Sequence, residues 1–93
     1  MLFLTDYKVR PGLDRSETKR LMDIFGSRGS SPGEIAHYVK VNGSGGVIVS
    51  DVDDVSKVYE ETLAYVEFME FSIQPILKVA DAVGPILAEL AKG

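Results

Sequence analysis

The residue best suited to acid–base chemistry in this sequence is its single histidine, His37. Histidine is the residue type whose side chain gains and loses a proton most readily near neutral pH, so a general acid or base is expected to use it. The composition of residues 34–41 predicts a β-strand, which places His37 on one face with Val39 and Val41. Two interpretations stay open: a base that reaches into a ligand pocket, or a hydrogen-bonded histidine of the core or of an interface.

The hairpin that follows determines which residues share the face of His37. The segment after this strand is rich in asparagine, glycine and serine, which are typical of a tight turn. A four-residue loop over residues 43–46 pairs Val39 with Ser50 and predicts a returning strand over 47–50. Ser50 then lies on the face of His37 and becomes a candidate ligand-binding residue.

Two further side chains, Tyr7 and Glu70, are candidates for the same pocket. Tyr7 lies in a strand expected over residues 2–9, where its hydroxyl could orient a ligand. Glu70 lies on the polar side of a strand expected over residues 68–77, and a carboxylate enclosed in a pocket could act as a general base. The other interpretation of Glu70 is a carboxylate that faces solvent or pairs with an arginine across an interface. The candidate catalytic residues are therefore His37, Tyr7 and Glu70, and the candidate ligand-binding residues are Tyr7, His37, Ser50 and Glu70.

The remaining clusters do not match motifs for cofactors or metals. The glycine-rich segments 26–33 and 43–46 both precede strands, whereas nucleotide-binding glycine loops open a helix. Asp51, Asp53 and Asp54 lack the spacing of a calcium loop and fit the capped start of a helix. Cysteine is absent, which excludes disulfides and thiolate zinc sites, and one histidine cannot form a poly-histidine site. No cofactor and no metal is predicted.

Three helices are expected between and after the strands. The first begins with a capping box of Asp14 and Glu17, and Gly26 closes it. The last must start near Asp81 or Gly84, because Pro85 is tolerated only in a first turn. The second helix has an apolar stripe at helical spacing that predicts a core-facing side, and it consists of Val55, Val58, Tyr59, Thr62, Leu63 and Val66.

The element order β-α-β-β-α-β with a C-terminal helix predicts a single domain over residues 1–93 with the ferredoxin-like, split βαβ fold. In this α+β fold two helices cover one face of a four-stranded antiparallel sheet. The other face is expected to be partly apolar, because the first strand is apolar on both sides, with Leu2 and Leu4 on one and Phe3, Tyr7 and Val9 on the other. Phe68 adds an apolar residue to the otherwise polar side of the last strand. We expect a second copy of the chain to cover that face, which gives a homodimer through the sheet.

Composition and charge exclude other classes of protein. The chain has 93 residues and a net charge of −4, which argues against a nucleic-acid binder. No apolar run approaches the roughly 20 residues of a membrane span, and Asp6 interrupts the first apolar residues too early for a signal peptide. A cytoplasmic protein without membrane contact is expected.

Several segments, MLFLTDYKVRPG, IAHYVKVNGSGG, DVDD and EFMEFSIQPIL, resemble a bacterial family of small proteins of unknown function in the dimeric α+β barrel group. The resemblance covers about residues 1–88. It implies a homodimer whose two sheets face each other to form a barrel. It implies no single reaction, since relatives in the group include cofactor-independent monooxygenases, haem-degrading enzymes and muconolactone-isomerase-like enzymes.

Two hypotheses for the function follow. The first is a small-molecule-binding or interaction protein whose dimer encloses an apolar pocket. The second is a cofactor-independent enzyme, monooxygenase-like or isomerase-like, on a small organic substrate. In the enzyme hypothesis His37 is the base and either Tyr7 or Glu70 assists it.

Overall fold

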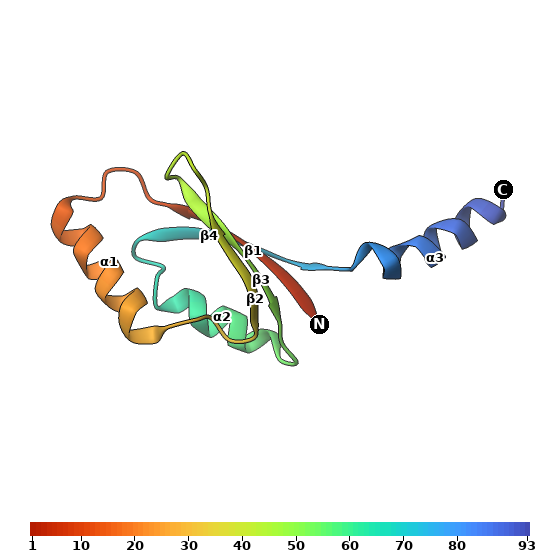
Figure 1. Cartoon of the computed structure of the whole chain (residues 1–93), viewed down its shortest axis with the longest axis horizontal. Coiled ribbons are helices and arrows are strands. Elements are labelled where there is room, and N and C mark those ends of the chain that lie inside the picture. The colour runs from red at the N-terminus through yellow and green to blue at the C-terminus, as the bar shows by residue number, and fades with distance from the viewer.

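Four strands and three helices follow one another in the order β-α-β-β-α-β-α in a computed structural model that describes all residues, 1–93 (Figure 1). The strands are β1 (Leu2–Val9), β2 (Glu34–Val39), β3 (Gly45–Asp51) and β4 (Met69–Ile76). The helices are α1 (Arg15–Arg28), α2 (Val55–Leu63) and α3 (Val79–Ala91). This is the ferredoxin-like α+β fold, so the predicted fold class is confirmed.

The four strands form one antiparallel sheet in the order β2-β3-β1-β4. Side chains alternate between the two faces of a strand, so Phe3, Thr5 and Tyr7 of the central strand β1 point to one face and are buried. Strand β4 lies at an edge, where Pro75 costs no internal ladder hydrogen bond. We call the opposite side of the sheet the open face; its apolar members are Leu2, Leu4, Ala36, Tyr38, Val47, Val49 and Ile76.

The turn between β2 and β3 lies earlier than expected. Residues 40–44 connect the two strands, and Val39 pairs with Gly46, so the predicted pairing with Ser50 is wrong. The side chain of Asn42 accepts hydrogen bonds from the backbone N–H and the hydroxyl of Ser44, which closes the turn before residue 45. The register differs by an even number of residues, so His37, Ile48 and Ser50 keep the face that they were expected to share.

Helix α1 begins as predicted and ends later. The carboxylate of Asp14 accepts the backbone N–H of Glu17 at 2.7 Å, which confirms the capping box. The helix continues through Gly26 to Arg28, so the expected end at Gly26 is wrong. Glycine inside a helix costs only about 1 kcal/mol. The helix ends at Gly29, which has a φ of 71° and donates its backbone N–H to the carbonyl of Phe25.

The core between the sheet and the helices consists of two small clusters. Phe68 is completely buried and precedes β4, so the prediction that it makes the open face apolar is wrong. The chain turns over residues 64–68, and this turn directs the ring under α1, where the guanidinium of Arg20 lies 5.2 Å from its centroid. The buried members of the clusters are Phe3, Val52 and Val58 in one, and Leu21, Tyr65 and Phe68 in the other.

Only part of the apolar stripe of α2 faces the core. Val58 is buried, whereas Tyr59 is 62% exposed, so the expectation that Tyr59 belongs to the core is wrong. Consecutive residues are about 100° apart around a helix, and α2 contacts the sheet through the side that carries Val58. The outer stripe of α2 is therefore exposed; it consists of Val55, Tyr59 and Leu63, and Val66 continues it just after the helix.

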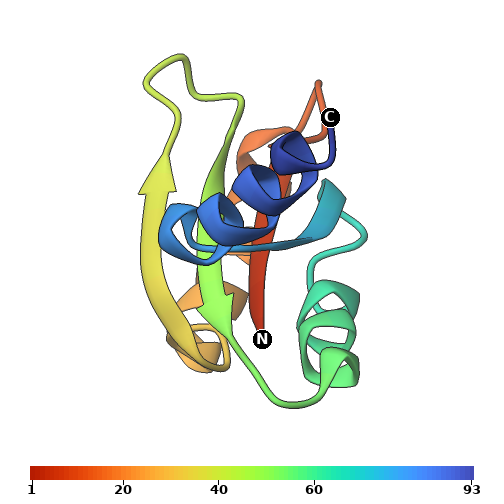
Figure 2. The ribbon, with the colours of Figure 1, turned by 90° about the vertical axis from the view of Figure 1, so that its right-hand side faces the viewer.

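Helix α3 lies apart from the rest of the chain. It begins at Val79 and contains Pro85 in its interior, so the expected start near Asp81 or Gly84 is wrong. The helix continues through the proline, although Pro85 has no N–H for the carbonyl of Asp81 and its ring crowds that carbonyl. Viewed toward the open face, α3 lies in front of the strands and α1 lies behind them (Figure 2). None of the residues of α3 is buried.

Candidate functional site

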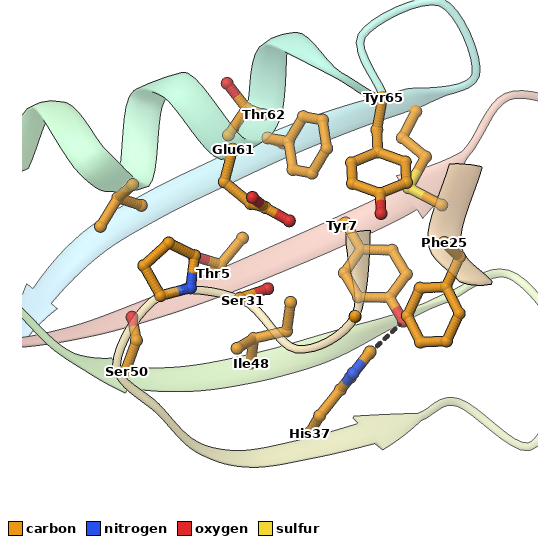
Figure 3. A pocket seen from close by; sticks show the side chains of 15 residues that line it. Thr5, Tyr7, Phe25, Ser31, His37, Ile48, Ser50, Glu61, Thr62 and Tyr65 are labelled. Atoms are coloured by element: carbon orange, nitrogen blue, oxygen red, sulfur yellow. Dashed lines mark hydrogen bonds between the residues drawn. The ribbon is translucent and has the colours of Figure 1, made fainter. Parts of the chain in front are cut away.

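A cavity lies between the helix-covered face of the sheet and the two helices α1 and α2 (Figure 3). The cavity volume is about 70 Å³, and the empty space around it, including the part that opens to solvent, is about 630 Å³. All four strands, both helices and the loop between α1 and β2 contribute to its wall. The lining residues are Thr5, Tyr7, Phe25, Gly29, Ser31, Pro32, His37, Ile48, Ser50, Val58, Glu61, Thr62, Tyr65, Met69 and Phe71.

The polar centre of the cavity is a hydrogen-bonded pair, Tyr7 and His37. The phenol oxygen of Tyr7 lies 2.6 Å from Nε2 of His37, and the two rings meet edge to face at 5.6 Å (Figure 3). The ring of Phe25 from α1 lies 6.2 Å from the imidazole on another side. An aromatic wall thus holds the imidazole while its Nε2 edge points at the phenol.

Glu34 completes a chain of polar groups behind this pair. Its Oε1 lies 3.6 Å from Nδ1 of His37, and each of the two side chains is 21% exposed. Residues three apart in a regular strand point to opposite faces. A β-bulge between Glu34 and Ala36 lets Glu34 pair with Ser50 while His37 pairs with Ile48, so both side chains reach the cavity face.

The tyrosine owes its position to a glycine on the neighbouring strand. Tyr7 on β1 pairs with Gly46 on β3. A β-carbon at Gly46 would collide with the phenol group of Tyr7 and with the backbone oxygen of Tyr38. The absence of a side chain there leaves the space in which the phenol lies across β3 toward His37.

The charges around the pair determine which atoms carry protons. The carboxylate of Glu34 favours a proton on Nδ1 of His37, so Nε2 accepts the hydrogen bond from the Tyr7 hydroxyl. Burial, and next the negative charge of Glu34, raise the pKa of Tyr7 above its ordinary value. The phenol is therefore neutral near pH 7, and its oxygen lone pairs can accept a hydrogen bond.

The helix side of the cavity has a second polar group of residues. The guanidinium of Arg28 donates to the carboxylate of Glu61 at 2.8 Å, which joins the end of α1 to α2. Tyr65 is buried beside them, and burial and the charge of Glu61 raise its pKa, opposed by Arg28. Because the guanidinium of Arg28 is paired with Glu61, it is not available as a free cation at this end of the cavity.

The structure brings three of the four candidate residues together. Tyr7, His37 and Ser50 line the same cavity, and Ser50 is only 3% exposed. Glu70 does not join them, because it is exposed on the open face, where it pairs in register with Lys8. The pocket lies on the apolar side of β4, and alternation directs Glu70 to the other side.

Sequence reasoning missed Glu34, whose carboxylate lies behind His37, and it did not place Tyr65, which lines the cavity, among the candidate site residues. Glu34 was overlooked because the bulge that turns it inward has no clear signature in the sequence. Tyr65 follows α2, and a spacing of three and four residues from Val58 through Thr62 would have indicated that it lies on the same side.

Neither a metal site nor a membrane helix is found in the structure. No three His, Cys, Asp or Glu side chains are close enough to hold a metal ion. None of the helices has both the length and the apolar character that a membrane crossing requires.

The fold and the cavity define a small α+β protein with one partly buried Tyr–His pair. Over residues 1–90 the chain matches the family described as a domain of unknown function, DUF3303, and it belongs to that family. The predicted membership in a family of unknown function is thereby confirmed. A comparison with curated proteins found no match.

Proposed function

We propose that this protein binds a small organic molecule in the cavity between the sheet and the helices. The observation that supports this most directly is an apolar cavity in which one partly buried hydrogen-bonded pair, Tyr7 and His37, is the polar centre. Ligand sites are typically concave and mostly apolar, with a few polar groups that fix the orientation of the ligand.

The lining favours a flat, uncharged ligand that carries a hydroxyl or N–H group. Aromatic rings from Phe25, Tyr65 and Phe71 border the space and can stack on a ring. The lone pairs of the Tyr7 oxygen accept a hydrogen bond from the ligand while the Tyr7 hydroxyl keeps its own proton and donates it to His37 Nε2. An anionic ligand is disfavoured, because the carboxylate of Glu61 lines the cavity, that of Glu34 lies behind His37, and Arg28 is paired with Glu61.

A thermal-shift screen with small cyclic alcohols, phenols and amides tests this proposal. A ligand at 100 times its Kd stabilises the protein by about 2.7 kcal/mol, which raises Tm by roughly 10 °C or more for a chain of this size. Tyr7→Phe is expected to reduce the shift, whereas Tyr38→Phe, the same change on the open face, leaves it intact. A hit that is equally strong in Tyr7→Phe, or a complete screen without hits, contradicts the proposal.

The alternative function is acid–base catalysis on a small organic substrate without a cofactor. The arrangement Glu34–His37–Tyr7 specifically favours it. The Tyr7 oxygen can take a proton from an acidic C–H or O–H of the substrate while its own proton moves to His37 Nε2, and Glu34 stabilises the imidazolium. Exchange of a ligand C–H for deuterium, followed by NMR in D₂O, detects this activity. It should require both Tyr7 and His37 and should be absent from His37→Gln.

For the assembly we propose a homodimer formed through the open face. The support is the apolar character of that face, where Leu2, Leu4 and Val49 remain partly exposed in a single chain. Light scattering is expected to give twice the chain mass of 10.1 kDa, and the mass of one chain at micromolar concentration contradicts it. We also propose a cytoplasmic location, which fractionation of cells checks.

A further inference from the structure

The least explained part of this structure is α3. It extends away from the sheet at one end of the molecule (Figure 1), and none of its residues is buried. The chain therefore has a radius of gyration of 16.6 Å, compared with about 12 Å for a compact domain of this length. One side of the helix is a continuous apolar stripe that is 44–80% exposed and consists of Val79, Val83, Ile86, Leu87 and Leu90.

Such a helix is not expected to persist alone in water. It has 13 residues, and isolated helices shorter than about 12–15 residues are marginal even for favourable sequences. Its interior contains Gly84 and Pro85, and the proline has no N–H for the ladder. No side chain caps its start at Lys78. Some surface must therefore bury the stripe for the helix to be stable.

A surface of matching size lies on the open face of a second copy. The 13 residues of α3 span about 20 Å, and four strands are about 14–19 Å across. Because α3 and the open face lie on the same side of the sheet (Figure 2), a copy that approaches this face comes within reach of the helix. Five aliphatic side chains bury roughly 300–600 Å². Two such contacts, counted on both partners, reach the roughly 1,200–2,000 Å² of a stable interface.

We propose that α3 is an exchanged arm. In the dimer each α3 lies across the open face of the other copy, with its apolar stripe against that sheet. This inference rests on the proposed dimer and goes beyond it, because it names the element that joins the copies. Val83, Ile86 and Leu90 lie along the centre of the stripe and form the middle of the contact, whereas Ala88 on the opposite side of the helix faces solvent.

Hydrogen–deuterium exchange of the full chain at several protein concentrations, together with the mass from light scattering, tests the arm. The backbone N–H groups of α3 are expected to be protected where the protein has twice its chain mass. They should lose that protection on dilution to the single chain. A mass of one chain at all concentrations overturns the dimer and the arm together. A dimeric mass with unprotected α3 overturns the arm alone, and protection of α3 in the single chain shows that it folds onto its own body, which also overturns the arm.

Matched substitutions locate the contact. Ile86→Gln is expected to raise the Kd of the dimer at least about tenfold, whereas Ala88→Gln changes it less than about twofold because its side chain faces solvent. On the receiving surface, Val49→Gln on the open face should reduce the protection of α3, and Tyr59→Gln on the outer stripe of α2 should not. Loss of protection in Tyr59→Gln alone would place the arm on α2 and overturn the proposed location.

Discussion

At the scale of single residues, the site depends on the room that Gly46 leaves for the phenol of Tyr7. The pairing of Tyr7 with Gly46 could not be predicted, because it depends on a turn that Asn42 closes early. The sharing of one face by His37 and Ser50 was nevertheless correct, since an even register shift preserves the faces. Glu70 shows the limit of this reasoning. The alternation of side chains along β4 predicts the face of the sheet on which Glu70 lies, but it does not predict which face borders the cavity.

Gly46→Ala tests the role of this glycine. The new β-carbon meets the Tyr7 phenol and the Tyr38 carbonyl, so we expect a loss of about 1–3 kcal/mol in the free energy of unfolding, together with displacement of the phenol. Gly26→Ala is the matched control, because its β-carbon meets nothing within 4 Å in α1 and should stabilise the helix by up to about 1 kcal/mol. Urea unfolding measures both, and equal effects of the two substitutions contradict the account.

The raised pKa of Tyr7 predicts a pH dependence of stability. A group whose pKa is higher in the folded than in the unfolded state contributes stability below its unfolded pKa, about 10 for tyrosine. That contribution disappears as the pH rises through the folded pKa. We therefore expect Tm to fall above about pH 10, and to fall less in Tyr7→Phe, in which only Tyr65 still contributes. An identical alkaline decline in wild type and Tyr7→Phe contradicts this.

At the scale of elements, the presence of the strands and helices was largely predictable from the sequence. The irregularities within them were not. The capping box at Asp14 gave the start of α1, and apolar alternation gave β1 and β4. The bulge in β2 that turns Glu34 inward, and the outward side of α2 that exposes Tyr59, depend on contacts with other elements. Local spacing does not contain that information.

Asp14→Ala tests the predicted start of α1. Loss of the hydrogen bond to the N–H of Glu17 should cost about 1 kcal/mol in the free energy of unfolding. Asp23→Ala within the same helix breaks only a weak contact of 4.0 Å with Lys19 at the surface, so we expect a change below about 0.5 kcal/mol. Thermal unfolding followed by circular dichroism compares the two, and an Asp14→Ala protein as stable as Asp23→Ala contradicts the capping argument.

At the scale of the whole molecule, the chain has a thin core, with 11 of 93 residues buried. The single ferredoxin-like arrangement could be predicted from the order of the elements. The position of α3 could not be predicted, because its apolar stripe is not buried against its own chain. The sequence argument from Pro85 concerned only the residue at which the helix begins.

If a second copy of the chain adds buried surface to the thin core, the stability of the protein depends on its concentration. Because association favours the folded dimer by mass action, Tm should rise by several degrees between about 1 and 100 µM. Differential scanning fluorimetry over this range measures the effect. Ile86→Gln should lower Tm at each concentration, and a Tm that is independent of concentration in the wild type contradicts the proposed assembly.

The central claim, that Tyr7 and His37 form the polar centre of a ligand site, is tested most directly by NMR of the one imidazole in the chain. In protein labelled with ¹⁵N-histidine, the account predicts a proton on Nδ1 and an Nε2 resonance that shifts in Tyr7→Phe but not in Tyr38→Phe. A ligand found by thermal shift should move the same resonance. An imidazole protonated on Nε2 that responds to neither the ligand nor Tyr7→Phe would contradict the account.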